Sequence, residues 1–300
     1  MKKSLCLLMI LVLIFSLFAC SKGNESKENK KENAGKVDNA DTDKKSEKKE
    51  PEVAEIEETV LVDEGGLKIT ALNIDYNYLS GTHIGVNIMI ENNTGYDITL
   101  LSDEGGVNGY MLDASLAVDV RNGESVNDCI SFYTSAIKRC DIETISFFEF
   151  KFRAESENYR INDGFRLRTD YVMLKTTAFD TYATNYTVDG TVIYDKNNIK
   201  VAVKDINYDY HWVLLFVENK SDAICTISEK DMYINGKEFW SLAHCELIPS
   251  ERYTVMILEY SDDDMEEYGI TDINEMKISV EIQEEHFLKV DTSELVDIKL

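Results

Sequence analysis

Apolar and polar residues alternate with a period of two over most of the chain after residue 58. In residues 83–92 every second side chain is a branched aliphatic one, and in residues 146–155 phenylalanine recurs at alternate positions. Such alternation is typical of a β-strand that turns one face toward a core. Residues 212–217 are apolar on both faces, so we expect this strand to be more fully buried.

The pattern of strands and turns occurs twice in the chain. Residues 60–76 match residues 192–208 at an offset of 132, and the offset is 127 from the next strand onward. The second offset places Gly123-Glu124 over Ser250-Glu251 and Tyr133 over Tyr260. The remaining matched segments are 86–109 with 213–236 and, at an offset of 131, 141–150 with 272–281. The shared apolar positions and turns indicate a tandem duplication.

Each copy predicts a β-sandwich. About seven short strands, with turn residues roughly every 8–12 positions, are typical of immunoglobulin-type sandwiches, although the Cys…Trp…Cys signature of antibody domains is missing. The predicted fold class is therefore all-β, with two tandem immunoglobulin-like sandwiches over residues 59–177 and 191–300. Residues 178–190 are expected to form the linker between them.

The same turn occupies the middle of both copies. Asn108-Gly109 and Asn235-Gly236 each follow an apolar β-branched residue. This pair predicts a type I′ hairpin turn, which needs two residues with positive φ. The turns are followed by Tyr110 and Lys237, which occupy the same place with different chemistry. We therefore expect the scaffold to be repeated and any function to lie where the copies differ.

The start of the chain predicts an export signal and a tether. Residues 1–19 combine two lysines with an uncharged apolar run that is shorter than the roughly 20 residues of a membrane-spanning helix. Residues 20–58 are rich in Lys, Glu, Asn and Asp and contain no aromatic residue. A segment of this composition cannot bury enough apolar surface to order itself. We expect a disordered tether with a reach of about 35 Å.

The end of the apolar run resembles the lipobox of bacterial lipoproteins. Leu17, Ala19 and Cys20 match that motif, whereas Phe18 stands where a small residue is usual. The resemblance implies that Cys20 is lipidated and becomes the N-terminus after cleavage. The expected location is the extracytoplasmic face of the cell membrane, with the lipid anchor as the contact to the bilayer.

The repeats resemble the uncharacterised immunoglobulin-like domains found in lipoproteins of low-GC Gram-positive bacteria. Those domains carry a Val/Ile-Asn-Gly turn, matched here by residues 107–109 and 234–236, and a turn before the next strand, matched by residues 121–125 and 248–252. The resemblance implies a cell-surface lipoprotein with tandem sandwiches. It implies no activity.

Charge and motifs narrow the expected function. The chain holds 31 Lys and Arg against 56 Asp and Glu, a net charge of −25, which argues against nucleic acid and anionic lipid headgroups as partners. It contains no G-x-S-x-G elbow, H-E-x-x-H motif, P-loop or G-x-G-x-x-G loop. We therefore expect no enzyme, no catalytic residues and no cofactor. The expected function is a binding or adhesion module for a protein or glycan, with a structural spacer or envelope assembly partner as the alternative.

Two groups of residues are candidate metal sites. His244 and Glu246 would share one face of a strand, and Asp262, Asp263 and Asp264 with their neighbouring glutamates offer oxygen ligands for calcium. Neither group has the spacing of a known site. We expect no metal, and instead a helix that Asp262 or Asp263 caps and Gly269 ends.

Cysteines and sequons leave alternatives open. Cys129 with Cys140 and Cys225 with Cys245 could form disulfides in an exported chain, or the four could be free buried thiols. Residues 92–94 and 219–221 match the glycosylation sequon at equivalent places of the two copies. We interpret both as turn residues.

Overall fold

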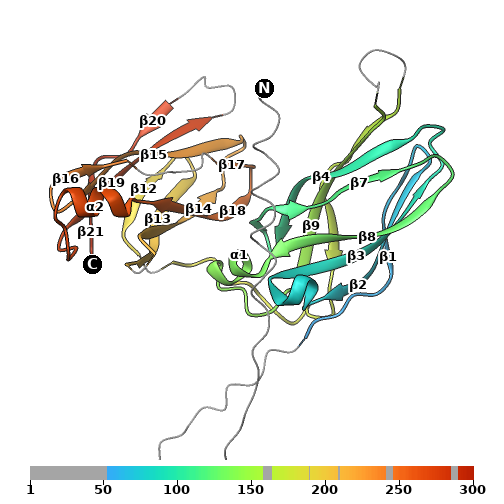
Figure 1. The fold of residues 1–300 in the computed structure, drawn as a ribbon, viewed down its shortest axis with the longest axis horizontal. Helices are drawn as coiled ribbons and strands as arrows, with labels where there is room; N and C mark the ends of the chain where they lie inside the picture. The colour runs from blue at the N-terminus through green and yellow to red at the C-terminus, as the bar shows by residue number, and fades with distance from the viewer. Residues whose placement is uncertain (1–52, 158–163, 189, 209, 241–245, 285–289) are drawn as a thin grey trace, which may run out of the picture. The chain divides into compact units, whose positions relative to one another are not determined.

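The structure is a computed structural model that describes residues 53–300 apart from 158–163, 189, 209, 241–245 and 285–289 (Figure 1). The predicted signal peptide, Cys20 and all but the last six residues of the predicted tether lie outside the described residues. In the part that is described, no helix is long and apolar enough to cross a bilayer.

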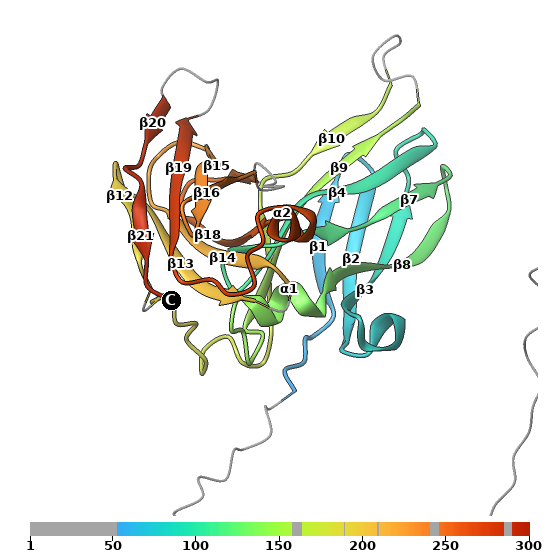
Figure 2. The same ribbon diagram turned by 60° about the vertical axis from the view of Figure 1, so that its left-hand side comes forward.

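The first half of the described chain forms two antiparallel sheets, seen as two layers in Figures 1 and 2. One sheet has the order β1 (Thr59–Glu64), β2 (Leu67–Asp75), β3 (His83–Asn92), β8 (Ser125–Tyr133) and β6 (Ala114–Ser115). The other contains β10 (Arg166–Arg168), β9 (Phe147–Glu155), β4 (Ile98–Val107) and β5 (Tyr110–Met111), with β7 (Ala117–Val120) beside β4 and β11 (Val172–Lys175) beside β9. A short 3-10 helix, η1 (Tyr78–Gly81), and α1 (Thr134–Arg139) connect strands.

The second half repeats this topology. One sheet has the order β18 (Arg252–Glu259), β14 (Trp212–Asn219), β13 (Ile199–Asn207) and β12 (Val192–Lys196). The other contains β16 (Lys237–Phe239), β15 (Cys225–Ile234), β19 (Met276–Glu284) and β20 (Val290–Thr292), with β17 (Glu246–Ile248) beside β15 and β21 (Val296–Ile298) beside β19. The helix α2 (Asp262–Glu267) takes the place of α1.

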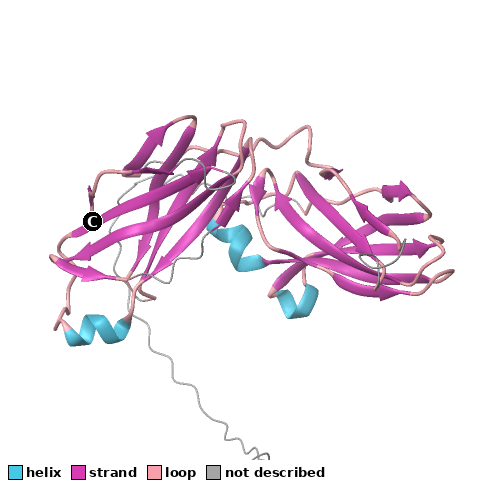
Figure 3. Ribbon diagram, turned by 90° about the horizontal axis from the view of Figure 1, so that it is seen from above, coloured by secondary structure: helices cyan, strands magenta, loops and turns pink. Residues whose placement is uncertain are grey.

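The alternating pattern packs as predicted. The aliphatic side chains at alternate positions of β3 are buried, and so are Phe148, Phe150 and Phe152 of β9. They lie in one hydrophobic core, while the second half builds another core from the inward faces of its own two sheets. Strands dominate the molecule and the helices are short (Figure 3). The predicted all-β sandwich fold is confirmed.

The duplication extends to irregular features of the sheets. Each copy carries a β-bulge between its first two strands, one between the second and third, and one in the strand after the third. A bulge inserts one residue that has no ladder partner, and its position is set by the local sequence rather than by the general fold. Matching bulges at three places therefore support descent of both halves from one unit.

The hydrogen-bonded register corrects the sequence alignment of the second part of each copy. Ile90 pairs with Val126, whereas its equivalent Val217 pairs with Thr254, so β8 and β18 correspond at an offset of 128 and not 127. Phe148 faces Val107 as Met276 faces Ile234, which also gives 128 and not 131 for β9 and β19. One additional residue before β18 accounts for the change of offset from 127 to 128. The offset of 131 rested on the similarity of residues 141–142 to residues 272–273.

The predicted turns form as expected, with one correction. Asn108, Gly109, Asn235 and Gly236 all have positive φ, as a type I′ turn requires. The helix α2 is capped by Ser261, whose hydroxyl accepts a hydrogen bond from the Asp264 amide, and not by Asp262 or Asp263. Gly269, with a φ of +64°, follows the last turn, as the sequence predicts.

Candidate functional site at the junction of the two sandwiches

One sheet runs through both sandwiches. The hairpin strand β5 of the first copy pairs in parallel with the edge strand β18 of the second, through Tyr110 and Tyr253. The Tyr253 amide donates to the Gly109 carbonyl over 3.3 Å, and the Thr254 hydroxyl donates to the Met111 carbonyl over 3.3 Å. We call this contact of β5 with β18 the junction.

The Asn108-Gly109 turn holds β5 in place for this contact. The Asn108 side-chain oxygen accepts hydrogen bonds from the amides of Ser146 and Phe147, at 2.7 and 3.1 Å, and its amide group donates to the Thr144 carbonyl over 2.8 Å. Asn235 makes the equivalent bonds to the loop between α2 and β19, through Asp272, Asn274 and Glu275. The turn is therefore a repeated structural device, and the residue after it decides what each copy presents.

Four aromatic rings pack at the junction, and we call them the aromatic cluster: Tyr110, Tyr186, Phe216 and Tyr253. Tyr110 is only 2% exposed, and its ring centroid lies 5.6 Å from Tyr186, 5.9 Å from Tyr253 and 6.4 Å from Phe216. Tyr186 and Tyr253 stack with centroids 4.0 Å apart. Burial raises the pKa of the Tyr110 hydroxyl above its ordinary value, so the ring stays neutral.

The predicted linker takes part in this packing. The Tyr186 hydroxyl donates a hydrogen bond of 2.6 Å to the carbonyl of Asn108, which ties residues 178–190 to the hairpin turn of the first copy. Phe179 contacts Phe147 at 5.9 Å between ring centroids. The segment between the sandwiches is thus held to the first sandwich by the side chains of Phe179 and Tyr186.

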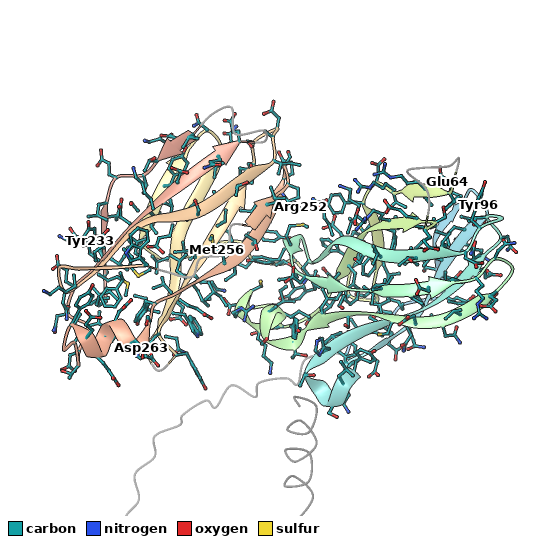
Figure 4. All side chains as sticks on the ribbon, turned by 45° about the horizontal axis from the view of Figure 1, so that its top comes forward. Glu64, Tyr96, Tyr233, Arg252, Met256 and Asp263 are labelled. Atoms are coloured by element: carbon teal, nitrogen blue, oxygen red, sulfur yellow. The ribbon has the colours of Figure 1, made fainter. Side chains whose placement is uncertain are left out.

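A buried ion pair lies next to the aromatic cluster. The Arg252 guanidinium of β18 donates to the Glu149 carboxylate of β9 over 2.8 Å, and Arg252 is labelled in Figure 4. Glu149 is 4% exposed, and burial raises the pKa of its carboxyl despite the nearby cation. Its second oxygen and the Arg252 Nε have no hydrogen-bond partner among the described residues. The pair therefore links the sandwiches at a desolvation cost.

A second set of charges surrounds this pair. The ring of Tyr171 lies 4.8 Å from the Arg252 guanidinium, and its hydroxyl donates to the carboxylate of Glu104. Lys151 forms a 2.8 Å ion pair with the same carboxylate. Burial and this hydrogen bond raise the pKa of Tyr171, which keeps the phenol protonated as a donor. All of these groups have partners that orient them within the protein.

Two large apolar side chains are exposed at strands β16 and β17, which both pair with β15 of the second sandwich. Trp240 is 79% exposed directly after β16, and Leu247 of β17 is 70% exposed. Leu247 pairs with Thr226, and that register places Asp119 at the equivalent position of the first copy. Trp240 follows the buried Phe239, which corresponds to Leu112, so its equivalent is Asp113. We call Trp240 and Leu247 the apolar edge.

The candidate metal ligands of the sequence are not brought together in the described part of the chain. Among the described residues, no group of three or more His, Cys, Asp or Glu side chains could hold a metal ion. Asp262 contacts the ring of His211, and Asp263 and Asp264 lie in the first turn of α2. His244 lies outside the described residues, as does Cys245.

The sequons and cysteines have structural roles. The buried Asn92 amide donates to the carbonyls of Tyr96 and Val120, each over 2.8 Å, and Asn219 repeats this arrangement in the second copy. The interpretation as turn residues is confirmed. Cys129 is a buried free thiol, so the bridge to Cys140 is absent, and Cys225 is a buried free thiol as well. Cys20 lies outside the described residues.

The junction residues could not be identified from the sequence. One usable signal is the difference between Tyr110 and Lys237 after equivalent turns. The apolar character of both faces of residues 212–217 was a second signal, because Leu214 and Phe216 pack against the core of the first sandwich. Neither signal names the opposing surface, which the chain contributes from a distant segment.

Comparison with known proteins adds no assignment. No family model and no curated protein matches the chain. Among solved structures, it is similar to the YadV chaperone, with 14% identity and a TM-score of 0.23 over 71% of this chain and 92% of that one. It is also similar to a protein of unknown function from Porphyromonas gingivalis W83, with 10% identity and a TM-score of 0.22 over 73% of this chain and 91% of that one. At these TM-scores neither likeness carries an argument about function.

Proposed function

We propose that this protein is a lipid-anchored surface protein that acts as a non-enzymatic binding or adhesion module for a protein or glycan. The anchor is the proposed lipid on Cys20, and residues 21–58 serve as the tether that holds the sandwiches away from the bilayer. The observation that carries the proposal is the apolar edge, because it combines strong exposure with divergence between the two copies.

The apolar edge has no structural explanation within the described chain. Trp240 and Leu247 replace the acidic residues Asp113 and Asp119 of the first copy, on a protein with a net charge of −25. A change from carboxylate to large apolar side chain gives up solubility unless a partner covers it. Tryptophan is the residue most enriched among those that dominate binding energy, since it buries a large rigid surface. We place the proposed ligand contact at these two residues.

The surroundings of Glu149, whose pKa is raised, support a non-enzymatic role. A catalytic carboxylate must reach a substrate, and its raised pKa then serves proton transfer. Glu149 is instead covered by protein and held by Arg252. The pKa of Glu149 is raised because the residue is buried at the junction. There its ion pair with Arg252 connects the two sandwiches.

The ligand contact can be tested by binding assays on the full chain. The protein is immobilised and exposed to cell-wall fragments, a glycan array and extracellular matrix proteins. Trp240→Ala should weaken binding of the captured ligand by about 30-fold, the effect of losing a hot spot of about 2 kcal/mol. Tyr210→Ala is the matched control, since Tyr210 is a comparably exposed aromatic of the same sandwich and should leave binding unchanged. Absence of binding across the panel would count against the proposal.

The anchor is tested separately in cells. Cys20→Ala should release the protein from the membrane fraction, because the thiol is the proposed site of lipid attachment. A wild-type protein that stays in the membrane without forming a globomycin-sensitive precursor would contradict lipidation. Neither result bears on the proposed ligand contact at Trp240.

The alternative function is a spacer or assembly partner of an envelope complex, and the junction favours it. A continuous sheet and a buried ion pair couple the sandwiches, which suits a part of fixed geometry. Chemical cross-linking in the native cell separates the two functions. A spacer should capture one stoichiometric neighbour, whereas an adhesion module should give none until its ligand is added.

A further inference from the structure

We propose that the cavity between α1 and the strands β13 and β14 binds a small organic anion. This site is independent of the apolar edge and goes beyond the proposed function. The cavity measures about 450 Å³, within the usual range of small-ligand sites. It is lined by Lys138, Arg139, Asp141, Lys204, Asp205, Trp212 and Leu214, which we call the α1 pocket.

The end of α1 supplies the cations on one side of the pocket. Lys138 and Arg139 form the last turn of the helix, and the Ile142 amide donates back to the Ile137 carbonyl over 3.4 Å to close it. Asp141 has a φ of +55°, in the left-handed region that favours glycine. An aspartate tolerates this conformation better than most residues, and here its carboxylate contacts Lys204 of the second sandwich.

A β-bulge supplies the cation on the other side. The ladder between β13 and β14 skips from Val203 to Asp205, so Lys204 has no partner in the sheet. Bulges commonly re-aim a side chain at a functional site. Lys204 is directed to Asp141, and Trp212 and Leu214 of β14 form the apolar wall of the same cavity. Figures 1 and 2 both show α1 beside β13 and β14.

The cations of α1 have no acidic partner in the described part of the chain. No ion pair within 4 Å involves Lys138 or Arg139, and the buried Arg139 Nε has no hydrogen-bond partner. Residues 59–300 hold 44 Asp and Glu against 20 Lys and Arg, so unpaired cations that face a cavity are unexpected on composition alone. Lys138 is exposed and Arg139 is half-buried, so their cationic groups can donate charge-assisted hydrogen bonds to a carboxylate or phosphate in the cavity.

Stabilisation of the helix end does not account for these cations. Cations in a last helical turn interact favourably with the helix dipole. The equivalent helix α2, however, carries Glu266 and Glu267 where α1 carries Lys138 and Arg139, and α2 forms without them. The basic residues are therefore specific to the copy whose helix borders the cavity.

Every lining residue of the α1 pocket differs from its equivalent in the other copy. The substitutions follow from the paired registers and helix ends of the two copies. The equivalents, in the order of the lining residues given above, are Glu266, Glu267, Gly269, Leu72, Asn73, Gly85 and Asn87. Packing against the first core explains Trp212 and Leu214. It does not explain why three of the remaining five positions became basic.

The pocket selects the class of ligand. Three cationic against two acidic side chains leave a formal charge of about +1, which suits one carboxylate or one phosphate group. The wall formed by Trp212 and Leu214 suits an apolar or ring-shaped body attached to that group. A long polyanion is disfavoured, because the rest of the chain is strongly acidic and would repel it.

Binding can be followed by NMR on the full-length protein without altering it. The chain has two tryptophans, Trp212 in the pocket and Trp240 on the apolar edge, so the two indole NH signals report on the two sites separately. The probes are cyclohexanecarboxylate, glucuronate and inorganic phosphate, with cyclohexanecarboxamide as the neutral match. At least one of the two organic anions should shift the Trp212 signal saturably while the Trp240 signal stays in place. A response to phosphate alone would contradict an organic ligand, because the wall of Trp212 and Leu214 would then contribute nothing to binding.

Two variants complete the test. Arg139→Gln should weaken the responding anion by about 10-fold or more, as expected for losing a charge-assisted hydrogen bond. Arg121→Gln removes an exposed arginine elsewhere on the same sandwich and should leave affinity unchanged. Lys138→Gln, at an exposed position, gives a second reading if Arg139→Gln fails to fold.

Three results would overturn the proposal. One is no saturable Trp212 shift up to about 10 mM of either organic anion, a level that would mostly fill even a millimolar site. Another is equal affinity for the carboxamide and the carboxylate. The third is unchanged affinity in a folded Arg139→Gln variant. A shift of Trp240 alone would support the apolar edge and argue against the α1 pocket.

Discussion

Replacing Tyr110 by alanine tests whether the junction stabilises the fold or merely records a contact. Tyr110 is 2% exposed and touches three aromatic rings, from the linker and from both strands of the second sandwich that meet it. Truncating a large aromatic residue in a core costs about 3–5 kcal/mol through lost burial and the cavity left behind. Little collapse is expected here, because the surrounding rings are themselves held in sheets.

The duplication provides a matched control for this substitution. Lys237 follows the same Asn-Gly turn in the second copy, but it is exposed, and only its ammonium group approaches an aromatic ring, that of Tyr268 at 5.8 Å. Lys237→Ala should change the free energy of unfolding by no more than about 0.5 kcal/mol, as most surface substitutions do. Both variants shorten the side chain of the residue that follows the Asn-Gly turn. The difference between their free energies of unfolding therefore isolates the contribution of the junction.

Urea unfolding monitored by circular dichroism gives the measurement. With a dependence on urea of about 3 kcal/mol per molar, Tyr110→Ala should lower the unfolding midpoint by about 1 M or more. A double-mutant cycle with Tyr253→Ala should give a coupling of about 0.5–3 kcal/mol between the two tyrosines. If Tyr110→Ala lowers the midpoint no more than Lys237→Ala does, the aromatic cluster does not stabilise the protein and the argument for a coupled pair of sandwiches fails.

Three further predictions follow from buried polar groups. Asn92→Ala and Asn219→Ala should each lower the free energy of unfolding by about 2 kcal/mol or more, because backbone groups lose their buried partners; melting curves test this, and a loss under 0.5 kcal/mol in both would contradict it. Burial raises the pKa of Glu149 above its ordinary value of 4.5, so the folded state binds this proton more readily and loses stability as pH rises through the raised pKa. In urea titrations, the stability of Glu149→Gln relative to wild type should therefore increase from pH 4 to pH 8. Burial also raises the pKa of Cys129 to about 11 and of Cys225 to about 12, so both thiols should alkylate slowly at pH 8 until the protein unfolds, as mass spectrometry of labelled peptides would show.

The sequence predicts the features that local chemistry decides. A period of two places the aliphatic residues of β3 in the core, and Asn108-Gly109 adopts its turn because only a few residue types tolerate positive φ. These are preferences of a few neighbouring residues, so they can be recognised without knowing the fold. The all-β sandwich class follows from repeating them along the chain.

The junction depends on contacts that no local pattern encodes. Tyr110 and Tyr253 are 143 positions apart, and a single residue pair joins β5 to β18. Nothing in the letters around Tyr110 distinguishes a buried aromatic from an exposed one after a turn. The one-residue change of offset before β18 cannot be read from residue similarity for a related reason. The hydrogen-bonded pairing of adjacent strands determines the register, whereas similarity between residue types does not.

The α1 pocket was beyond sequence reasoning because its residues come from three separate segments. Lys138 reads as an ordinary basic helix end, and Lys204 reads as an exposed strand residue until the bulge is known. The pocket residues nevertheless stand out when the two copies are aligned by their strand register. A correct alignment sets Lys138 against Glu266 and Lys204 against Leu72, changes that a shared scaffold does not require.

The divergence of the copies also solves a problem that duplication creates. A contact between the β5 edge of one copy and the β18 edge of the next is head-to-tail, so identical copies would leave one matching edge free at each end and could assemble into open filaments. The free edges are not identical here. At the equivalents of Tyr110 and Met111, β16 carries Lys237 and Glu238, and β8 carries Ser125 where β18 carries Tyr253. Tyr110 and Tyr253 are thus present only on the two edges that meet. Charged side chains on an edge strand, such as Lys237 and Glu238 of β16, oppose pairing with another molecule.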